Sequence, residues 1–458
     1  MVPVPRNLTA NPTADQTADP TADQTAASSR TTRSTAWARS IGSGLLFVAL
    51  AVVAQLARQP GHSSRDTVWA EDGRIFTDDA LTHHAVSTLL RGYAGYTQFA
   101  TRALALGTRL FDPRSYATYL AVSATVVVAL LGLVVVRSAR SWVTSPVLRW
   151  SLGVMVVIAP VMFSELTATI TNVGWPFLIA GFWAIASREE GRFDTPLRAA
   201  TVLLGAVSTV IQIVLLPWAI AMAIYRRRRS DLIVLASLVG GLGIQAIAVK
   251  ASSAQAAAGS RDVGRFFEAL GLRVLGSLVA GERWIAHLSS TGTIEVGIAS
   301  LVAVLVMAML ARPGRLDRDR RVLVAGAVIT AFGAYVTTVW FRGTSAVDLG
   351  VPEGVVMGGG RYSYLPVLLL FSALVVMVDS SGRRWLQVLL VAQTAFVIAT
   401  SLTLANPRST GPSWTVSVRA AEAECRADPN LATATLPISP EPVWAMQINC
   451  DRLRSSSG

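Results

Sequence analysis

Two adjacent carboxylates, Glu71 and Asp72, stand a few residues beyond the first long apolar run, in the stretch TVWAEDGRIFTDDAL (67–81). A carboxylate that is partly desolvated at a membrane surface has a raised pKa and can accept a proton from a hydroxyl group. Because adjacent side chains point in different directions, one acid can act as the base while the other binds a metal ion or a sugar hydroxyl. The structural alternative is that Asp72 caps a helix beginning near Arg74.

The other two acids of this stretch, Asp78 and Asp79, are expected to lie in the first turn of a helix or on the surface. His83 and His84 follow Asp79 at helical spacing, which leaves a small metal site as an alternative. A lone cluster of this type is weak evidence for a metal, so the sequence leaves metal binding open.

A second candidate group lies in SELTATITNVGWP (164–176), where Glu165, Asn172 and Trp175 supply an acid, an amide and an aromatic ring. An ionisable residue at the end of an apolar run is costly there, which favours a functional role for Glu165. Aromatic rings and planar polar groups hold sugars, and Trp175 has that role or anchors the chain at the interface.

A third candidate is MGGGRYSYLP (357–366), immediately before a late apolar run. Three glycines allow close backbone approach, and Arg361 is suited to bidentate binding of a phosphate. Arg342 is a second choice for the same role. The alternative for Arg361 is a guanidinium that extends to the membrane interface from a helix end.

These groups need a scaffold, and the composition indicates a helical membrane protein. The chain is 52% hydrophobic and only 15% charged, with a mean hydropathy of +0.49. Its apolar runs are long enough to cross a hydrocarbon core of about 30 Å. We predict an all-α fold with eleven membrane spans near 41–57, 116–136, 147–163, 173–187, 199–207, 209–225, 231–250, 293–311, 322–341, 363–379 and 385–404.

The net charge of +12 indicates membrane topology and not nucleic-acid binding, because the arginines cluster in short connections between apolar runs. The repeated TAD(P/Q) segment is too polar to fold, so we expect residues 1–40 to be disordered in the cytoplasm. An odd number of spans then places the C-terminus outside a bacterial plasma membrane. The basic clusters that support this orientation are Arg137/Arg140/Arg149, Arg188/Arg192/Arg198, Arg226 to Arg229, Arg312 to Arg321 and Arg383/Arg384.

The stretch between Arg198 and Arg226 is too short for two full spans, although both of its ends carry inside-type charge. Two half-helices that meet near Ser208 to Gln212 reconcile the length with the charge. Broken helices are tolerated where they are buried in protein or line a wet cavity. The sequence therefore predicts a site at depth beside this break.

The three long connections are all expected outside. In the first, 58–115, residues 86–111 have the spacing of helices that lie on the bilayer surface, and residues 262–288 resemble them. The tail, 405–458, holds the only two cysteines, Cys425 and Cys450. In an oxidising compartment these are expected to form a disulfide, and two free thiols are the alternative.

Taken together, these motifs resemble the GT-C superfamily of integral-membrane glycosyltransferases, which use polyprenyl-phosphate-linked sugars. The resemblance rests on the acidic pair in a long first outer loop, on the interfacial helices and on Arg361-Tyr362 before a late span. It implies that Asp72 or Glu71 is the catalytic base and that Arg361 holds the donor phosphate. Substrate contacts are then expected from Trp69, Glu165, Asn172, Trp175 and Tyr362. Some members use a divalent ion such as Mg²⁺ or Mn²⁺, and others use none.

The function expected from this resemblance is the inverting transfer of a hexose or pentose to a cell-envelope glycan or lipid on the outer face. A lipid-linked donor accounts for the lack of Walker, Rossmann, HExxH and CxxC motifs in the sequence, because nucleotide sugars stay inside. Two alternatives remain. One is a transporter or flippase of a lipid-linked or anionic substrate, for which the sequence lacks repeated halves, and the other is a non-catalytic scaffold.

Overall fold

The structure is a computed structural model that describes residues 41–162, 165–189, 191–251, 262–288, 292–312, 316–343, 360–404 and 408–455. The segment 1–40, predicted to be disordered, lies outside these ranges, as do Gly358 and Gly359, two of the three glycines before Arg361. The chain divides into two compact units, Met1–Phe47 and Val48–Gly458. In the first unit the described residues, 41–47, are helical. Everything below concerns the second unit.

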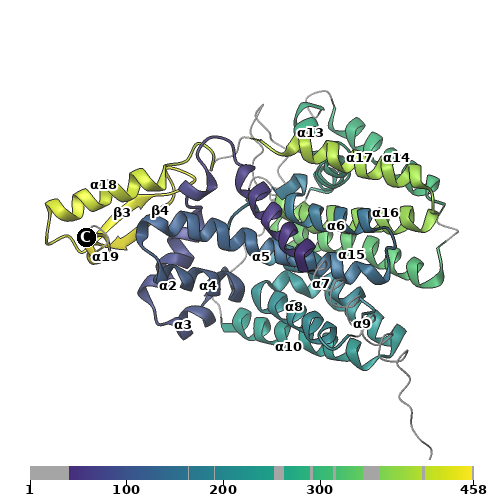
Figure 1. The fold of residues 1–458 in the computed structure, drawn as a ribbon, viewed down its shortest axis with the longest axis horizontal. Coiled ribbons are helices and arrows are strands. Elements are labelled where there is room, and N and C mark those ends of the chain that lie inside the picture. The colour runs from purple at the N-terminus through teal and green to yellow at the C-terminus, as the bar shows by residue number, and fades with distance from the viewer. Residues whose placement is uncertain are drawn as a thin grey trace, which may run out of the picture. The chain divides into compact units, whose positions relative to one another are not determined.

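The second unit is mostly helical (Figure 1). Six helices are long and apolar enough to cross a membrane, which supports a membrane protein. The eleven spans remain a prediction. The six candidates are Pro113–Ser141, which contains α5 (Tyr116–Ser138), α10 (Arg229–Ala251), α14 (Thr293–Leu310), α15 (Arg318–Arg342), α16 (Gly360–Ser381) and α17 (Arg384–Ser401). Shorter apolar helices of this unit occupy Pro146–Met162, Gly174–Ala186 and Val210–Arg226.

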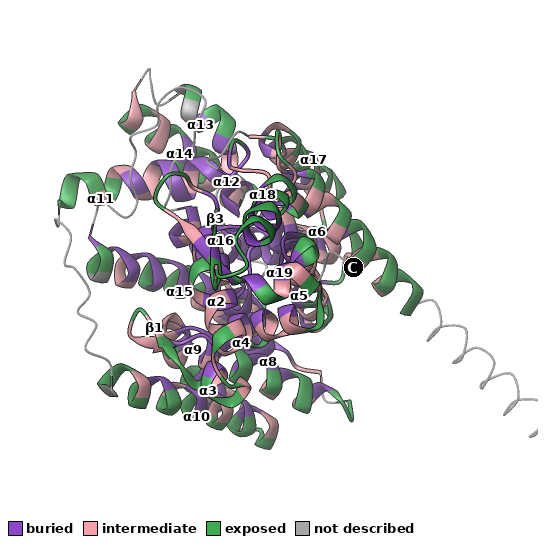
Figure 2. Cartoon of the chain, turned by 90° about the vertical axis from the view of Figure 1, so that its left-hand side faces the viewer, coloured by how far each residue is buried: buried purple, intermediate pink, exposed green. Residues whose placement is uncertain are grey.

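Helix α16 forms the centre of the helical bundle. It packs against α15, α6 (Pro146–Ile158) and α7 (Gly174–Ala186), and 89% of its most apolar window is buried. The corresponding share for α14 is 11%. Figure 2 shows this contrast, with α16 coloured as buried among helices that expose their outer faces. Apolar helices that expose so much surface are suited to contact with lipid.

The predicted break between two half-helices is confirmed. Helix α8 (Asp194–Ser208) ends before Thr209, which has an extended backbone with φ −153° and ψ 131°. A 3₁₀ segment, Val210–Leu215, then leads into α9 (Leu216–Arg226). The Thr209 side chain accepts a hydrogen bond from the Ile211 N–H, which satisfies one of the free donors at this new helix start.

The first long connection differs from the prediction of surface helices over 86–111. Helices α2 (Asp78–Thr82) and α3 (Ala85–Leu90) are followed by a hairpin of β1 (Gly92–Tyr93) and β2 (Tyr96–Thr97), and then by α4 (Phe99–Leu106). Its turn residues, Ala94 and Gly95, both have positive φ, as tight two-residue hairpin turns require. Helix α4 packs against α8 and buries Thr101, Arg102 and Ala105.

The tail folds as a small module of α18 (Trp414–Ala427), β3 (Thr433–Pro437), β4 (Ala445–Asn449) and α19 (Cys450–Ser455). The predicted disulfide joins Cys425 and Cys450. Strands β3 and β4 are antiparallel, with Thr433 opposite Asn449, and β3 alternates exposed and buried residues. The fold is therefore mostly helical with two small hairpins, which is consistent with the predicted all-α membrane protein. Short helices α11 (Val263–Ala269), α12 (Ser277–Val279) and α13 (Glu282–Leu288) lie within the predicted helical region 262–288.

Candidate functional site

A cavity of about 580 Å³ lies where several helices end. The C-terminal ends of α8, α10 and α15 reach it, together with the N-terminal ends of α7 and α16. This volume suits a small-molecule ligand. The polar and aromatic residues that line it are Glu71, Tyr93, Tyr96, Gln98, Thr171, Asn172, Trp175, Ser208, Thr209, Thr337, Thr338, Arg342, Arg361 and Tyr362.

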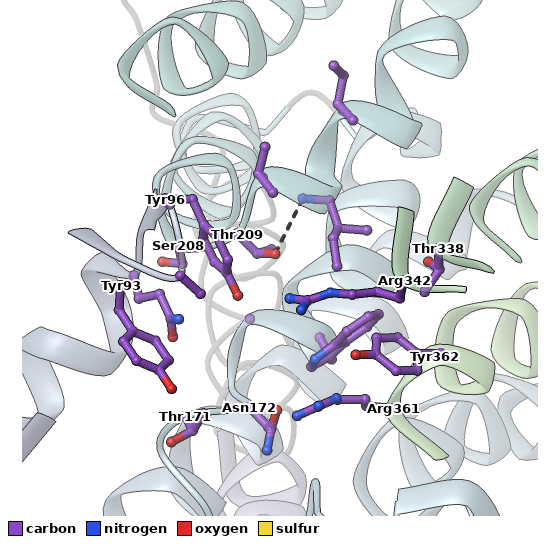
Figure 3. Close-up of a pocket in the computed structure, with 18 of the residues that line it drawn as sticks. Tyr93, Tyr96, Thr171, Asn172, Ser208, Thr209, Thr338, Arg342, Arg361 and Tyr362 are labelled. Atoms are coloured by element: carbon purple, nitrogen blue, oxygen red, sulfur yellow. Dashed lines mark hydrogen bonds between the residues drawn. The ribbon is translucent and has the colours of Figure 1, made fainter. Parts of the chain in front are cut away.

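The broken helix contributes one side of this cavity through Ser208 to Ile211 and Ile213. The predicted break therefore lies in the wall of a cavity. Figure 3 shows Tyr93 and Tyr96, from the hairpin, across the cavity from Arg342 and Arg361. The guanidinium groups of both arginines point toward the space between them and the hairpin.

The two adjacent acids of the first loop have different surroundings. Glu71 lines the cavity and is partly exposed, and its carboxylate has no hydrogen bond or ion pair within the described part of the chain. Asp72 is 1% exposed and does not line the cavity. Its carboxylate accepts hydrogen bonds from the N–H groups of Ile170 at 3.1 Å and Thr171 at 2.8 Å. Only Glu71 is therefore placed to meet a ligand.

Burial raises the pKa of Asp72 to about 6, although the bonds from Thr171 and the charge of Arg408 oppose the shift. Asp72 does not cap a helix near Arg74, because a π-helical turn, Asp72–Thr77, begins at Asp72 itself. Its side chain holds the loop between α6 and α7 instead.

Glu165 is ion-paired with Arg361, with 3.2 Å between Oε2 of the acid and Nε of the guanidinium. Burial raises the pKa of Glu165, and the charge of Arg361 opposes this shift. Of the two arginines expected to bind a phosphate, Arg361 thus already has an acidic partner. Arg342, by contrast, lines the same cavity, is exposed and has no partner among the residues that the structure describes.

Aromatic rings complete the cavity. Trp175 and Tyr362 pack edge to face with their ring centres 5.6 Å apart. Burial raises the pKa of Tyr93 and of Tyr96, so both phenols stay protonated at neutral pH and can donate hydrogen bonds. Sugars bind through such a combination of ring faces and hydroxyl or amide groups. The Asn172 amide, also in the lining, donates to the backbone oxygen of Glu165 at 2.8 Å.

Trp69, which the resemblance placed in the substrate site, lies outside the cavity lining. It forms a β-bridge with Ser439 of the tail and is 8% exposed. The neighbouring Ala70 N–H donates to the Ser439 carbonyl at 2.6 Å. Trp69 thus belongs to the contact between the first loop and the tail.

The alternative metal site near Asp79 does not form. The Asp79 carboxylate instead faces the guanidinium groups of Arg102 at 3.0 Å and Arg91 at 3.5 Å, and the His83 ring nitrogen lies 3.7 Å away. Across the described ranges, no group of three or more His, Cys, Asp or Glu side chains is placed to hold a metal ion. Among the described residues that line the cavity, Glu71 is the sole carboxylate, and the nearby Glu165 is paired with Arg361, so the donor set does not fit a divalent ion.

Comparison of the chain with protein-family models, with curated proteins and with solved structures finds no match. Any functional conclusion must therefore rest on the chemistry of the cavity.

The sequence did not identify Tyr93 and Tyr96 as cavity residues. The stretch RGYAGYTQ combines these two tyrosines with a turn signal, and that combination could have identified them.

Proposed function

We propose that this protein is a GT-C-like membrane glycosyltransferase that moves a sugar from a polyprenyl-phosphate-linked donor to a cell-envelope acceptor. The observation that carries the proposal is a pair of opposite charges in one aromatic cavity, Glu71 and Arg342, neither of which has a partner among the described residues. A transferase needs a free carboxylate to accept the proton of the acceptor and a free cation to stabilise the departing phosphate.

The reaction is a single displacement. The acceptor hydroxyl oxygen forms a bond to the anomeric carbon while the bond from that carbon to the phosphate oxygen breaks. The hydroxyl proton passes to the Glu71 carboxylate, and the bonding electrons leave with the phosphate, beside Arg342 and Arg361. Attack opposite the leaving group inverts the anomeric configuration.

An apolar groove supports a lipid-linked donor. A second cavity of about 340 Å³ shares Val210, Ile213 and Val249 with the first and runs beside α10. Only 22% of the most apolar window of α10 is buried, so this helix offers its other faces to lipid. Gln245, in the wall of the groove, is satisfied by Thr97 and Ala206. A hydrocarbon chain in the groove would keep its phosphate in the polar cavity.

The arginine clusters support a reaction on the outer face. The helix ends that surround the cavity are opposite to the ends that carry Arg188, Arg226 and Arg318. Basic clusters favour the cytoplasmic side, which supports an extracytoplasmic position for the cavity. Polyprenyl-linked sugars are the activated donors that suit this side, because their lipid tails remain in the membrane.

The test is release of polyprenyl phosphate by the purified full-length protein in lipid nanodiscs, with a panel of polyprenyl-phosphate hexoses and pentoses and an envelope-glycan extract as acceptor. Glu71→Gln is expected to reduce release by about 10²–10⁴-fold, the usual contribution of a general base. Asp78→Asn is the matched control, since Asp78 is an acid of the same stretch outside the cavity lining, and it should retain activity.

Full activity of Glu71→Gln would contradict the assigned base. Movement of the lipid-linked sugar across vesicle membranes by the wild type, with no release of polyprenyl phosphate, would instead favour the transporter or flippase.

A further inference from the structure

The loop before α7 forms part of the cavity wall, and it has little regular structure of its own. Thr171 and Asn172 face the cavity from this loop, and Trp175 follows in the first turn of α7. Ala168 has a positive φ of 55°, a conformation that non-glycine residues adopt at a cost. The loop has hydrogen bonds of its own, such as those from Thr169 and Asn172 to the Glu165 carbonyl, and two charged residues outside it add to them.

Asp72, which is not in the cavity lining, holds the second half of this loop. Its two carboxylate oxygens accept the N–H groups of Ile170 and Thr171 and the hydroxyl group of Thr171. The hydroxyl bond uses the same side chain that lines the cavity. The position of Thr171 in the wall is thus coupled directly to the Asp72 carboxylate.

Arg408, which lies beyond the last span, holds the first half of the same loop. Its Nη1 donates to the carbonyl oxygens of Thr167 at 3.2 Å and Ala168 at 2.9 Å. Its Nη2 donates to the carbonyl oxygens of Ser64 at 2.9 Å and Thr67 at 2.8 Å, and its Nε donates to the Thr67 hydroxyl at 2.9 Å. One guanidinium thus fastens the loop to the segment that leads to Glu71 and Asp72.

The two charged groups also offset each other. Asp72 and Arg408 are buried, at 1% and 3% exposure, and each favours the charged form of the other. Burial of either charge alone would be expensive. The five donations from Arg408 use the fork geometry that lysine lacks.

We propose that Asp72 and Arg408 form a positioning pair that sets the cavity wall, so that the tail segment is part of the site and not an appended domain. The pair acts through residues 165–173 and does not touch the ligand. The inference rests on the proposed function only in treating this cavity as the place of reaction, and the loop geometry can be tested without any activity.

Hydrogen exchange measured by mass spectrometry on the full-length protein in nanodiscs gives that test. Asp72→Asn is expected to raise exchange in peptides covering 165–173 about tenfold, because the amides of Ile170 and Thr171 lose an anionic acceptor. Arg408→Lys, which keeps the charge and loses the fork, should raise exchange in the same peptides. Peptides from α5 and α16 should stay unchanged. Glu71→Gln is the matched control and should leave loop exchange at the wild-type level.

Unchanged exchange over 165–173 in both Asp72→Asn and Arg408→Lys would overturn the proposal. If Asp72→Asn fails to fold, Thr171→Val removes only the hydroxyl bond to Asp72, and an unchanged loop in that variant would also overturn it. Sugar release adds a second readout. A positioning role predicts that Asp72→Asn lowers kcat by much less than the loss of about 10²–10⁴-fold expected for Glu71→Gln. A loss in Asp72→Asn as large as that in Glu71→Gln would make Asp72 the base and overturn the proposal.

Discussion

The two ends of the helical bundle use their charges differently. At the end away from the cavity, four aspartates near helix termini each have a guanidinium partner. These pairs are Arg137–Asp194 at 2.5 Å, Arg198–Asp231 at 2.5 Å, Arg320–Asp379 at 3.9 Å and Arg188–Asp319. At the cavity end, Glu71 and Arg342 line one space, and neither has a partner within the described part of the chain.

The ion pairs at the far end stabilise the fold, whereas Glu71 and Arg342 are placed to bind a ligand. A buried charge is tolerated when a partner compensates its lost hydration, and removal of that partner is costly. A partly exposed charge in a cavity keeps some hydration and can exchange it for a ligand. Neutral substitution of a charged residue should therefore lower stability at the end away from the cavity. At the cavity end, substitution of Glu71 or Arg342 should lower activity or binding and leave stability unchanged.

The largest expected effect on stability is at Asp231, which is buried together with Arg198. Asp231→Asn should lower the free energy of unfolding by about 3–5 kcal/mol, because it leaves a buried guanidinium without its counter-ion. Glu71→Gln should change it by no more than about 0.5 kcal/mol. Equilibrium unfolding in mixed detergent micelles measures both. Equal losses in the two variants would contradict the division between the ends.

The next effect concerns pH and belongs to Asp72, a buried charge behind the cavity wall. Burial raises its pKa from 3.8 to about 6, so the folded protein binds this proton more tightly than the unfolded chain does. Stability from this group therefore increases as pH falls from 7 to 4, by about 3 kcal/mol for a shift of about two pH units. Unfolding measured across this range should show that slope in the wild type. Asp72→Asn should lack it, and an identical slope in both proteins would assign it to other groups.

Much of the helical scaffold could be predicted from the sequence, because hydropathy and helix breaks are local properties. The break at Thr209 followed from charge and length alone. The hairpin at Tyr93 and Tyr96 was missed because the spacing of the surrounding apolar residues also fits helices. The two residues of its turn, Ala94 and Gly95, have positive φ, which ends the helix and allows the two strands to pair. In the tail, the alternation within β3 was present in the sequence but lay in a segment treated only as a disulfide-bearing tail.

The candidate site was predictable in its residue types and less so in its partners. Glu71, Asn172, Trp175, Arg361 and Tyr362 were singled out from the sequence and line one cavity. Which member of an adjacent acid pair faces a cavity depends on contacts made far along the chain. Asp72 meets residues about a hundred positions away, so spacing alone left its role open.

The smallest effect separates the two arginines of the cavity. Arg342 has no described partner, so Arg342→Gln should weaken binding of polyprenyl phosphate about tenfold without loss of stability, since a charge-assisted hydrogen bond contributes about 1.5 kcal/mol or more. Arg361 is committed to Glu165 at 3.2 Å. Arg361→Gln should therefore destabilise the protein by leaving a partly buried carboxylate alone, and Glu165→Gln in the same chain should restore stability.

Isothermal titration of the protein in nanodiscs with polyprenyl phosphate measures the loss of binding in Arg342→Gln. Unfolding in mixed micelles measures the loss of stability in Arg361→Gln. If both arginine variants lose binding equally and neither loses stability, the Glu165–Arg361 pair opens for the ligand. The cavity would then present two free cations in place of one. A diphosphate, which carries more negative charge than a phosphodiester, would in that case become the better match for the site.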